Sequence, residues 1–468
     1  DRDVTGVQTC ALPIYTFVGS IRAVEGTRAH QKVQSSYGEE YTPEYTLKHI
    51  LNYEDFTIEI EGRADGILIE NENIIIDEIK STIRPLDEID EDYNQLHWAQ
   101  GKCYGYMYAK ENKIDKLEVQ LTYFNIELEE TKKFVRCYTF KELEEFFLGL
   151  IKEYIEWANM TFYWEMVRDA AIKGLSFPFK NYRKGQRKLA VAVYETILNG
   201  KNLFAQAPTG IGKTISTIFP SIKAIGEGIA SKVFYLTAKT ITRQVALNSI
   251  SQMMDKGLRI KSIVITAKEK ICFNEEVKCN PKDCPYAKGH FDRVNQAIMD
   301  ILEKEDMLTR DIIVEYAKFH QVCPFEFSLY LSLWSDVIIC DYNYVFDPNV
   351  SLKRFFEANG NDYIFLIDEA HNLVDRSRDM FSAEITKKPF LKYKRLFKEE
   401  FPNISKAFNN CNNAMSKIKR DHISDEGFYY QKEEITDLYS PINRLIKELE
   451  QWLVNEKKHE LYEEVLEL

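Results

Sequence analysis

The segment Ala207–Thr214 reads Ala-Pro-Thr-Gly-Ile-Gly-Lys-Thr, and it constrains the fold of this chain more than any other feature of the sequence. A short apolar stretch within Lys201–Gln206 precedes it, and a helix-forming stretch follows it. In a strand–loop–helix unit the glycines let backbone N–H groups approach a phosphate, and the helix N-terminus adds a favourable dipole. The pattern therefore predicts a phosphate-binding loop on a parallel α/β sheet.

The motif predicts a role for each glycine and each polar residue at its end. Gly210 and Gly212 would let the backbone approach the phosphates closely. Lys213 would reach the β- and γ-phosphates of a nucleotide, and Thr214 would ligate Mg²⁺. ATP and Mg²⁺ are therefore the expected cofactors of this part of the chain.

A second motif completes the expected nucleotide site. The stretch Asp362–Leu373 is an apolar strand that ends in Asp-Glu-Ala-His. Asp368 would hold the Mg²⁺, and Glu369 would polarise the attacking water. A single acid after a core strand is often only a helix N-cap, but its pairing with the phosphate loop predicts an ATPase.

The N-terminal third carries a different pattern. Residues 56–61 alternate apolar and polar side chains, which predicts a strand, and a turn near Glu72 predicts a hairpin. Reflection about position 72 places residue 65 opposite residue 79, so Asp65 would lie within one position of both Glu78 and Lys80. Because residues i and i+2 share a face of a strand, Glu78 and Lys80 would project together.

Two acids and a lysine in one place indicate metal-dependent chemistry. Unpaired carboxylates are costly to bury together, and a hard divalent cation such as Mg²⁺ or Mn²⁺ would resolve the repulsion. Lys80 could then hold the attacking water or a developing negative charge. The simpler alternative is that Glu78 and Lys80 form an ordinary solvated ion pair.

This arrangement resembles the core of the PD-(D/E)xK nucleases. The stretch Glu25–Gln34 looks like the opening helix of RecB-type nucleases, and the resemblance implies that His30 binds metal with Asp65 and Glu78. His97, Gln100 and Tyr104 share one helical face, and the last two match the Gln-x-x-x-Tyr element that sits beside the substrate phosphate. The resemblance therefore implies a DNA nuclease in which Asp65, Glu78, Lys80, Gln100 and Tyr104 are catalytic.

Four cysteines lie between the two nucleotide motifs. They are Cys272, Cys279, Cys284 and Cys323. Three thiols close together in the chain and a fourth that returns later can enclose a metal or an iron–sulfur cluster, and spacing alone leaves zinc open. Cys340 ends an apolar run and is expected to be a core residue.

The position of this cysteine set resembles the XPD/DinG-type helicases, which belong to superfamily 2. In that family an insertion between the phosphate loop and the DEAH box holds a 4Fe-4S cluster, and the motor travels 5′ to 3′ along DNA. The stretch Cys323–Pro348 and the element Lys232–Ala246 also fit the family. The resemblance further implies that Gln186 reads adenine, and that single-stranded or forked DNA is the partner.

Composition limits the remaining classes. The chain has 468 residues and a formal net charge of −12, so any nucleic acid must be held by local patches rather than by a uniformly basic surface. The sequence shows no apolar run long enough to span a membrane and no signal segment. Nine cysteines without a secretion signal suggest a reducing cytoplasm. Oligomeric state is not predicted.

These observations together predict an α/β chain of several domains. Residues 1–14 resemble translated adapter sequence and are expected to be non-native. Residues 15–172 would form a nuclease-like α/β domain, and residues 173–375 a RecA-like domain with an iron–sulfur insertion at about 265–335. Residues 376–468 would begin a helical arch. The later motifs of a second RecA-like domain are absent from this sequence, so we expect a fragment with weak nucleotide binding and slow hydrolysis.

The function expected from the sequence is an ATP-dependent 5′ to 3′ DNA helicase fused to a metal-dependent nuclease, in repair or recombination. One alternative keeps the motor and makes the nuclease-like domain an inactive DNA-binding module. Another is a non-enzymatic DNA-binding remnant. DNA cleavage, and nucleotide binding by Lys213, would separate these three possibilities.

Overall fold

The structure is a computed structural model. It describes residues 20–468 except positions 54, 71–72, 127, 209, 357–361, 423–429, 433–434, 457–458 and 467–468. The segment 1–14 that we expect to be non-native, and the hairpin turn near Glu72, lie outside the described residues. The chain divides into two units. The first runs to Asp341 and adds Arg354–Asp368, and the second contains Tyr342–Lys353 and the chain from Glu369 onward.

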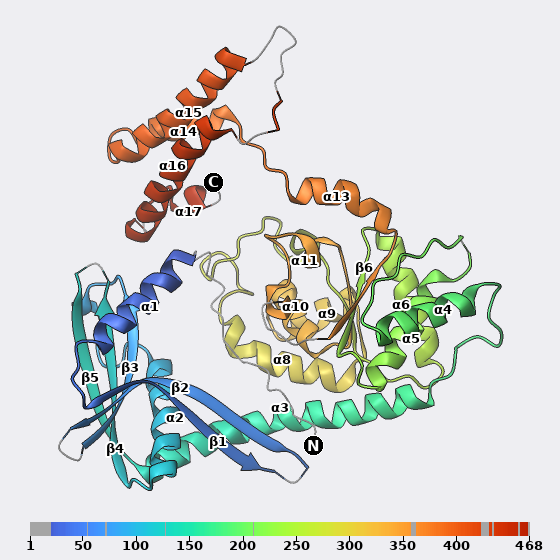
Figure 1. The fold of residues 1–468 in the computed structure, drawn as a ribbon, viewed down its shortest axis with the longest axis horizontal. Helices are drawn as coiled ribbons and strands as arrows, with labels where there is room; N and C mark the ends of the chain where they lie inside the picture. The colour runs from blue at the N-terminus through green and yellow to red at the C-terminus, as the bar shows by residue number, and fades with distance from the viewer. Residues whose placement is uncertain are drawn as a thin grey trace. The chain divides into compact units, whose positions relative to one another are not determined.

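The first unit begins with a five-stranded sheet in the order β1-β2-β3-β4-β5. Its strands are β1 (Tyr41–Asn52), β2 (Thr57–Glu70), β3 (Asn73–Thr82), β4 (Lys116–Asn125) and β5 (Glu130–Thr139). The pair β3–β4 is parallel, and the other neighbours are antiparallel. The parallel pair is connected by α2 (Gln95–Asn112), as a crossover between parallel strands requires (Figure 1).

Alternation along β3 gives the sheet two different faces. Ile76 packs with α2 in the main core of this region, whereas Ile79 packs with Ala29 and Val33 of α1 (Ser20–Gln34). The two isoleucines are three positions apart, so they project to opposite sides of the strand. The sheet therefore has a helix on each face, and the polar residues of β3 are distributed between them.

The predicted hairpin is present, but its register differs by one residue. Gly66 pairs with Asp77 and Glu70 with Asn73, so position 65 falls opposite 78 rather than 79. The prediction placed the centre of the turn half a residue too late, and the turn sequence alone does not fix that centre. The shift brings Asp65 directly to the level of Glu78.

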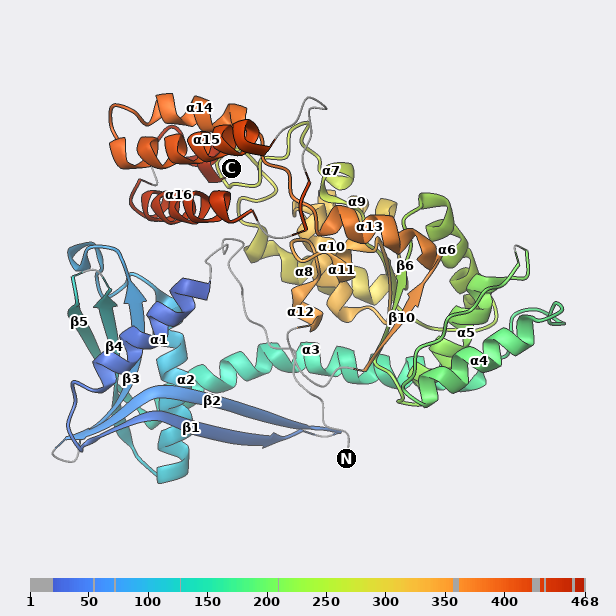
Figure 2. The same cartoon turned by 45° about the horizontal axis from the view of Figure 1, so that its top comes forward.

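A single helix, α3 (Phe140–Gly174), follows β5 (Figure 2). It begins with a capping box in which Thr139 and Glu142 satisfy each other's backbone N–H groups. Its C-terminal half docks on the next part of the unit, because Arg168 forms an ion pair with Asp336 at 2.8 Å and Trp164 donates to the same carboxylate. Lys223 of the helix α5 (Lys213–Gly226) donates to the Ile172 carbonyl at 2.7 Å.

The second sheet is parallel, with the order β10-β6-β9-β7-β8. Its strands are β6 (Lys232–Leu236), β7 (Ser262–Val264), β8 (Met307–Leu308), β9 (Val337–Cys340) and β10 (Tyr363–Ile367). The helices of this region are α4 (Gln186–Leu198), α5 (Lys213–Gly226), α6 (Thr240–Met254), α7 (Lys268–Ile271), α8 (His290–Lys304), α9 (Arg310–Phe319) and α10 (Pro324–Trp334), with the short α12 (Lys353–Phe356) before β10. A mixed α/β fold with a parallel sheet is thus confirmed.

The prediction of one strand is wrong. Residues 201–208, which precede the phosphate loop, form neither strand nor helix, and Phe204 is 93% exposed. Apolar composition favours a strand only when a neighbouring strand supplies a ladder and a face to pack against, and these residues have neither in the described structure. Cys340 is fully buried at the end of β9, so its expected core role is confirmed.

The second unit is helical. Its elements are α11 (Asn343–Phe346), the short η2 (Ala370–Asn372), α13 (Leu373–Met380), α14 (Lys387–Leu396), α15 (Pro402–His422), α16 (Thr436–Asn455) and α17 (Tyr462–Leu466). Phe397, Phe408 and Trp452 lie in its core, and α14, α15 and α16 pack side by side around them (Figure 2). No helix in the described parts of the chain has the length and apolar character needed to cross a bilayer.

Candidate functional site

Asp65, Glu78 and Lys80 converge at the carboxyl end of β3. The Lys80 ammonium forms an ion pair with the Glu78 carboxylate. Asp65 lies just beyond the last β2–β3 pair, where its Oδ2 accepts a hydrogen bond of 2.7 Å from the backbone N–H of Ile79. The three predicted residues are therefore brought together where the β2–β3 ladder ends.

Glu78 is the most buried member of this cluster. Its side chain is 1% exposed, and burial raises its pKa to about 7 despite the attraction of Lys80. Its Oε1 contacts Lys80, but its Oε2 is buried without a hydrogen-bond partner among the described residues. A buried carboxylate oxygen without a partner costs free energy unless a proton or a cation satisfies it.

His30 reaches the cluster from α1. Its Nδ1 lies 3.2 Å from Oδ1 of Asp65, and this hydrogen bond raises the pKa of His30 although burial opposes the shift. The imidazole is positioned by the helix, because Ala29 and Val33 pack α1 against Ile79 and Phe124. His30 thus lies where the nuclease resemblance places it, beside the first acid.

The helix α2 supplies the remaining predicted residues. Lys80 donates to Oε1 of Gln100 at 3.1 Å, and Nε2 of Gln100 donates to the Tyr104 hydroxyl at 3.2 Å. Tyr104 fits because position 62 is glycine: a Cβ there would lie 2.6 Å from the tyrosine ring. Lys80, Gln100 and Tyr104 therefore form one connected row across β3 and α2.

His97 does not join this row, although it shares the predicted helical face. Its Nδ1 lies 2.8 Å from the Tyr123 hydroxyl, and its Nε2 lies 3.0 Å from Nδ2 of Asn94. Burial lowers the pKa of His97 to about 4, so the ring is neutral at physiological pH. It links α2 to β4 as a packed, hydrogen-bonded residue.

Asp77, the acid next to Glu78, lies on the other face of the sheet. It is fully buried and accepts hydrogen bonds from Tyr37, Tyr41, Gln120 and Thr122. Burial raises its pKa, and these donors oppose the rise. Asp77 is therefore a satisfied structural carboxylate, which explains why only the second of the two consecutive acids belongs to the cluster.

A divalent cation suits the donors of this cluster. Carboxylate oxygens and an imidazole nitrogen are ordinary ligands of Mg²⁺ and Mn²⁺, and the unsatisfied Oε2 of Glu78 offers a free acceptor. In the described part of the chain, however, no three His, Cys, Asp or Glu side chains already form a metal-ligand group. Asp65 and Glu78 are instead paired with His30 and Lys80.

The phosphate loop lies in the second half of the first unit. Gly210 and Gly212 adopt left-handed backbone angles, with φ of 82° and 85°, and Lys213 and Thr214 begin α5. The φ of Gly212 favours glycine there, and a Cβ at this position would lie 2.5 Å from Nε2 of Gln186, whose side chain would have to shift. The N-terminus of α5 therefore lies beside Gln186, the residue to which the helicase resemblance gives the adenine contact.

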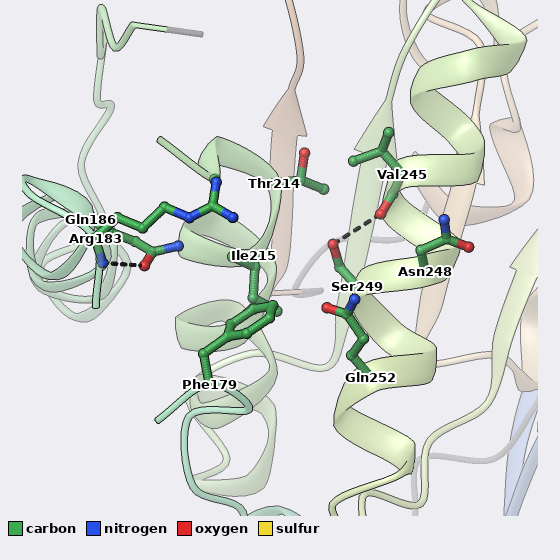
Figure 3. Close-up of a pocket in the computed structure, with 10 residues that line it drawn as sticks. Phe179, Arg183, Gln186, Thr214, Ile215, Val245, Asn248, Ser249 and Gln252 are labelled. Atoms are coloured by element: carbon green, nitrogen blue, oxygen red, sulfur yellow. Dashed lines mark hydrogen bonds between the residues drawn. The ribbon is translucent and has the colours of Figure 1, made fainter. Parts of the chain in front are cut away.

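A pocket of about 260 Å³ lies against this helix (Figure 3). Phe179, Arg183 and Gln186 line one side, and residues of α6 line the other, with Thr214 and Ile215 of α5 in between. The α6 residues are Val245, Asn248, Ser249 and Gln252. Gln186 is buried, and its Oε1 accepts a 2.9 Å hydrogen bond from the backbone N–H of Arg183.

Sequence reasoning missed Arg183. Its guanidinium donates a hydrogen bond to the carbonyl of Gly210, so Arg183, which precedes the phosphate loop in the chain, supports the backbone of that loop. The basic and aromatic composition of residues 176–190 marks only a boundary, because nothing in it shows which arginine reaches the loop.

Asp368 and Glu369 are divided between the two units. Asp368 follows β10, and its backbone N–H donates to the Leu236 carbonyl of β6 at 3.0 Å. It therefore lies at the carboxyl end of the parallel sheet, where open α/β sheets bind ligands. Glu369 opens the second unit in a left-handed conformation with φ of 50°, and its carboxylate lies 3.5 Å from Nδ1 of His371.

The four predicted ligand cysteines lie between α7 and α10. Cys272 caps the end of α7, Cys279 is exposed, Cys284 is buried, and Cys323 caps the start of α10. As described, they do not form a group that could hold a metal, so the predicted cluster site is not assembled in this structure. Burial raises the pKa of the Cys323 thiol, which favours its neutral form.

The start of α8 joins two of the cysteine-bearing segments. His290 is buried and accepts a hydrogen bond of 3.2 Å from the backbone N–H of Cys323. Arg293 donates to the carbonyls of Lys288 and Gln321 at 2.8 Å and 2.6 Å. These bonds tie the segment after Cys284 to the segment before Cys323.

Comparison with known proteins identifies the central part of the chain. Residues 237–390 match the DEAD_2 family. The chain is 25% identical over 256 residues to "Probable ATP-dependent helicase MJ0942" of Methanocaldococcus jannaschii, a match that covers 54% of this chain and 36% of that protein. It is 23% identical over 264 residues to "Regulator of telomere elongation helicase 1" of Homo sapiens, with coverage of 45% and 21%.

Two further proteins are similar to this chain. The chain is 21% identical over 243 residues to the "General transcription and DNA repair factor IIH helicase subunit XPD/RAD3" of Saccharomyces cerevisiae, covering 45% of this chain and 31% of that protein. The solved structure "XPD_Helicase" aligns with 18% identity and a TM-score of 0.36, covering 58% of this chain and 48% of that one. The chain thus carries a DEAD_2 domain and spans at most about a third of these sequence relatives.

Proposed function

We propose that this chain is part of an ATP-dependent DNA helicase whose N-terminal region is a metal-dependent DNA nuclease. The helicase half is supported by the DEAD_2 match and by relatives that are named as helicases, one of them a DNA repair factor. The nuclease half is carried by one observation. Glu78 is buried beside Asp65 and Lys80 with an unsatisfied carboxylate oxygen, which a proton or a cation must satisfy.

In the motor, Lys213 and Thr214 at the start of α5 would bind the nucleotide phosphates and Mg²⁺, and Asp368 would complete the metal site. Glu369 would orient the attacking water. Gln186, buried beside the loop, would contact the adenine base. The resemblance of the motifs to XPD/DinG-type helicases implies movement in the 5′ to 3′ direction along single-stranded or forked DNA.

In the nuclease, Asp65 and Glu78 would bind Mg²⁺ or Mn²⁺ with the help of His30, and the metal would activate water and stabilise charge on the scissile phosphate. Lys80 would give up part of its ion pair with Glu78 and would hold the attacking water or the negative charge that develops on the phosphate. Gln100 and Tyr104, which already form a row with Lys80, would contact the substrate phosphate.

The four cysteines would bind a 4Fe-4S cluster. This proposal rests on their order in the chain, on the similarity to XPD-type helicases, and on the α8 bonds that link the Cys284 and Cys323 segments. Purified protein should absorb visible light in the iron–sulfur bands and contain iron and sulfide. Stoichiometric zinc without iron would replace the cluster with a structural zinc site.

A second function has an observation in its favour. Asp65 and Glu78 are each already paired with a cationic or ionisable side chain of the protein, His30 and Lys80. Such pairing suits a nuclease-like domain that binds DNA without cutting it. The decisive experiment combines forked DNA, ATP and Mg²⁺ and follows both strand separation and strand cleavage, with Lys80→Ala as the control that removes only cleavage. Unwinding without metal-dependent cleavage would select the second function.

A further inference from the structure

Asp65 is held from α1 at two points one helical turn apart. Nδ1 of His30 lies 3.2 Å from the Asp65 carboxylate, and Nε2 of Gln34 donates to the Asp65 backbone carbonyl at 2.9 Å. Residues four positions apart lie on the same helix face, so α1 presents both groups to one residue. The carboxylate and the backbone of Asp65 are thus fixed by the same helix.

The β1–β2 ladder is interrupted at the same place. Its register passes from Pro43–Gly66 directly to Tyr45–Ala64, and it leaves out Glu44 and the residue opposite, Asp65. Glu44 has a φ of 54°, a left-handed conformation that a residue with a side chain rarely adopts. Strained backbone of this kind persists only where surrounding contacts enforce it, and it concentrates at functional sites.

Gln34 bridges the interruption. Its Nε2 donates to Oε1 of Glu44 at 2.9 Å as well as to the Asp65 carbonyl, and Arg63 forms an ion pair with the other Glu44 oxygen at 2.7 Å. Both bonds of Gln34 require the amide NH₂, so the orientation of this amide is fixed by two acceptors. The Asp65 carbonyl therefore has a side-chain partner at the point where the strand ladder is broken.

We infer that Gln34 and Glu44 are positioning residues for the nuclease site, and this inference rests on the proposed nuclease function. By holding Asp65 outside the ladder, they leave its carboxylate free to reach the Ile79 N–H and His30 and to face Glu78 across the strand end. Neither residue touches the reacting atoms. Their effect on the reaction passes through the placement of the Asp65 carboxylate.

The test uses Mn²⁺ alone as the probe, measured by isothermal titration on the purified chain. Gln34→Leu removes the donor at similar volume and should weaken Mn²⁺ binding at least tenfold. Glu44→Gly removes the acceptor but relieves the left-handed strain, so it should weaken Mn²⁺ binding while thermal stability stays equal or rises. Gln31→Leu, at an exposed position of the same helix, is the matched control and should bind Mn²⁺ as the unmodified protein does.

The double variant Gln34→Leu with Glu44→Gly distinguishes positioning from general damage. Both residues act through the one hydrogen bond from Gln34 to Asp65. The double variant should therefore bind Mn²⁺ no more weakly than the single variant that has the lower Mn²⁺ affinity. Unchanged Mn²⁺ affinity in Gln34→Leu, or fully additive losses, would overturn the inference while leaving the nuclease proposal intact. An unmodified protein that binds no Mn²⁺ would remove both.

Discussion

The ammonium of Lys80 lies 3.1 Å from the amide oxygen of Gln100, and this contact joins β3, the strand that carries Glu78, to α2. Gln100 in turn donates to Tyr104, so the position of the lysine depends on α2. The contact links the Glu-x-Lys element of β3 to the Gln-x-x-x-Tyr element of α2, and the two contacting residues are 20 positions apart in the chain.

Gln100→Leu should therefore slow metal-dependent DNA cleavage without abolishing it. The lysine keeps its ion pair with Glu78 but loses its second anchor, and the Tyr104 hydroxyl loses its donor. We expect a fall in kcat of roughly tenfold, equal to about 1.4 kcal/mol of transition-state stabilisation. Single-turnover cleavage of single-stranded DNA measures this. Gln95→Leu, on the exposed first turn of α2, is the control, and equal rates for both variants would contradict the role of Gln100.

Glu78 should give the protein a characteristic dependence of stability on pH. Burial raises its native pKa to about 7 from the ordinary 4.5, so the native state binds the proton more tightly than the unfolded state does. The resulting stabilisation is fully present below about pH 4.5 and is lost as the pH rises through about 7, an effect of roughly 3 kcal/mol.

Urea unfolding in EDTA at pH 5 and pH 8 measures this effect. The difference between Glu78→Gln and the unmodified protein should change by that amount between the two pH values, in favour of the unmodified protein at pH 5. Mn²⁺ should restore stability to the unmodified protein at pH 8, because a cation replaces the proton on the buried carboxylate. A constant difference at both pH values would show that Glu78 titrates normally.

Nucleotide binding should depend on the loop and on the arginine behind it. Lys213→Ala removes the charge expected at the β- and γ-phosphates and should weaken ADP binding more than tenfold. Arg183→Ala removes the bond to the Gly210 carbonyl and should weaken binding less, by a few fold, because the loop loses support rather than a ligand contact. Fluorescent ADP titration measures both, with the exposed neighbour Lys184→Ala as control. Equal affinities for all four proteins would argue against a nucleotide site here.

Arg293 should contribute to stability well beyond an ordinary partly exposed arginine. It donates to the carbonyls of Lys288, His320 and Gln321, and Gln321 has a left-handed φ of 54° that these bonds support. Arg293→Ala should lower the free energy of unfolding by about 2 kcal/mol, the scale of charged hydrogen bonds. Urea unfolding measures the loss. Lys288→Ala, which changes an exposed side chain of the same region, should be nearly neutral. A neutral Arg293→Ala would show that the two cysteine segments do not need this link.

The sequence predicts the elements whose own pattern determines them. The alternation of residues 56–61 is local, and the structure contains this strand as the first part of β2. The convergence of Asp65 with Glu78 was predicted because the position of a hairpin turn determines which residues of its two strands pair. The observed register is displaced by one residue from the predicted one. Gln186 beside Gly212 was predicted only through a family resemblance.

What the sequence could not predict depends on contacts between distant segments. Gln34 and Glu44 are 31 and 21 residues before Asp65, and nothing in their local sequence indicates that they meet it. The expected strand before the phosphate loop is missing because apolar composition cannot supply a partner strand. His97 follows the helical period but is drawn to Tyr123 of β4, a contact that depends on the sheet.

The most direct test of the account is cleavage of labelled single-stranded DNA by the purified chain in Mg²⁺ or Mn²⁺, with Asp65→Asn and Lys80→Ala beside it. The account predicts cleavage that EDTA stops, and a loss of at least a hundredfold in each variant while both remain folded. Cleavage that persists in both folded variants, or no cleavage by the unmodified protein when it demonstrably binds the metal and the DNA, would contradict it.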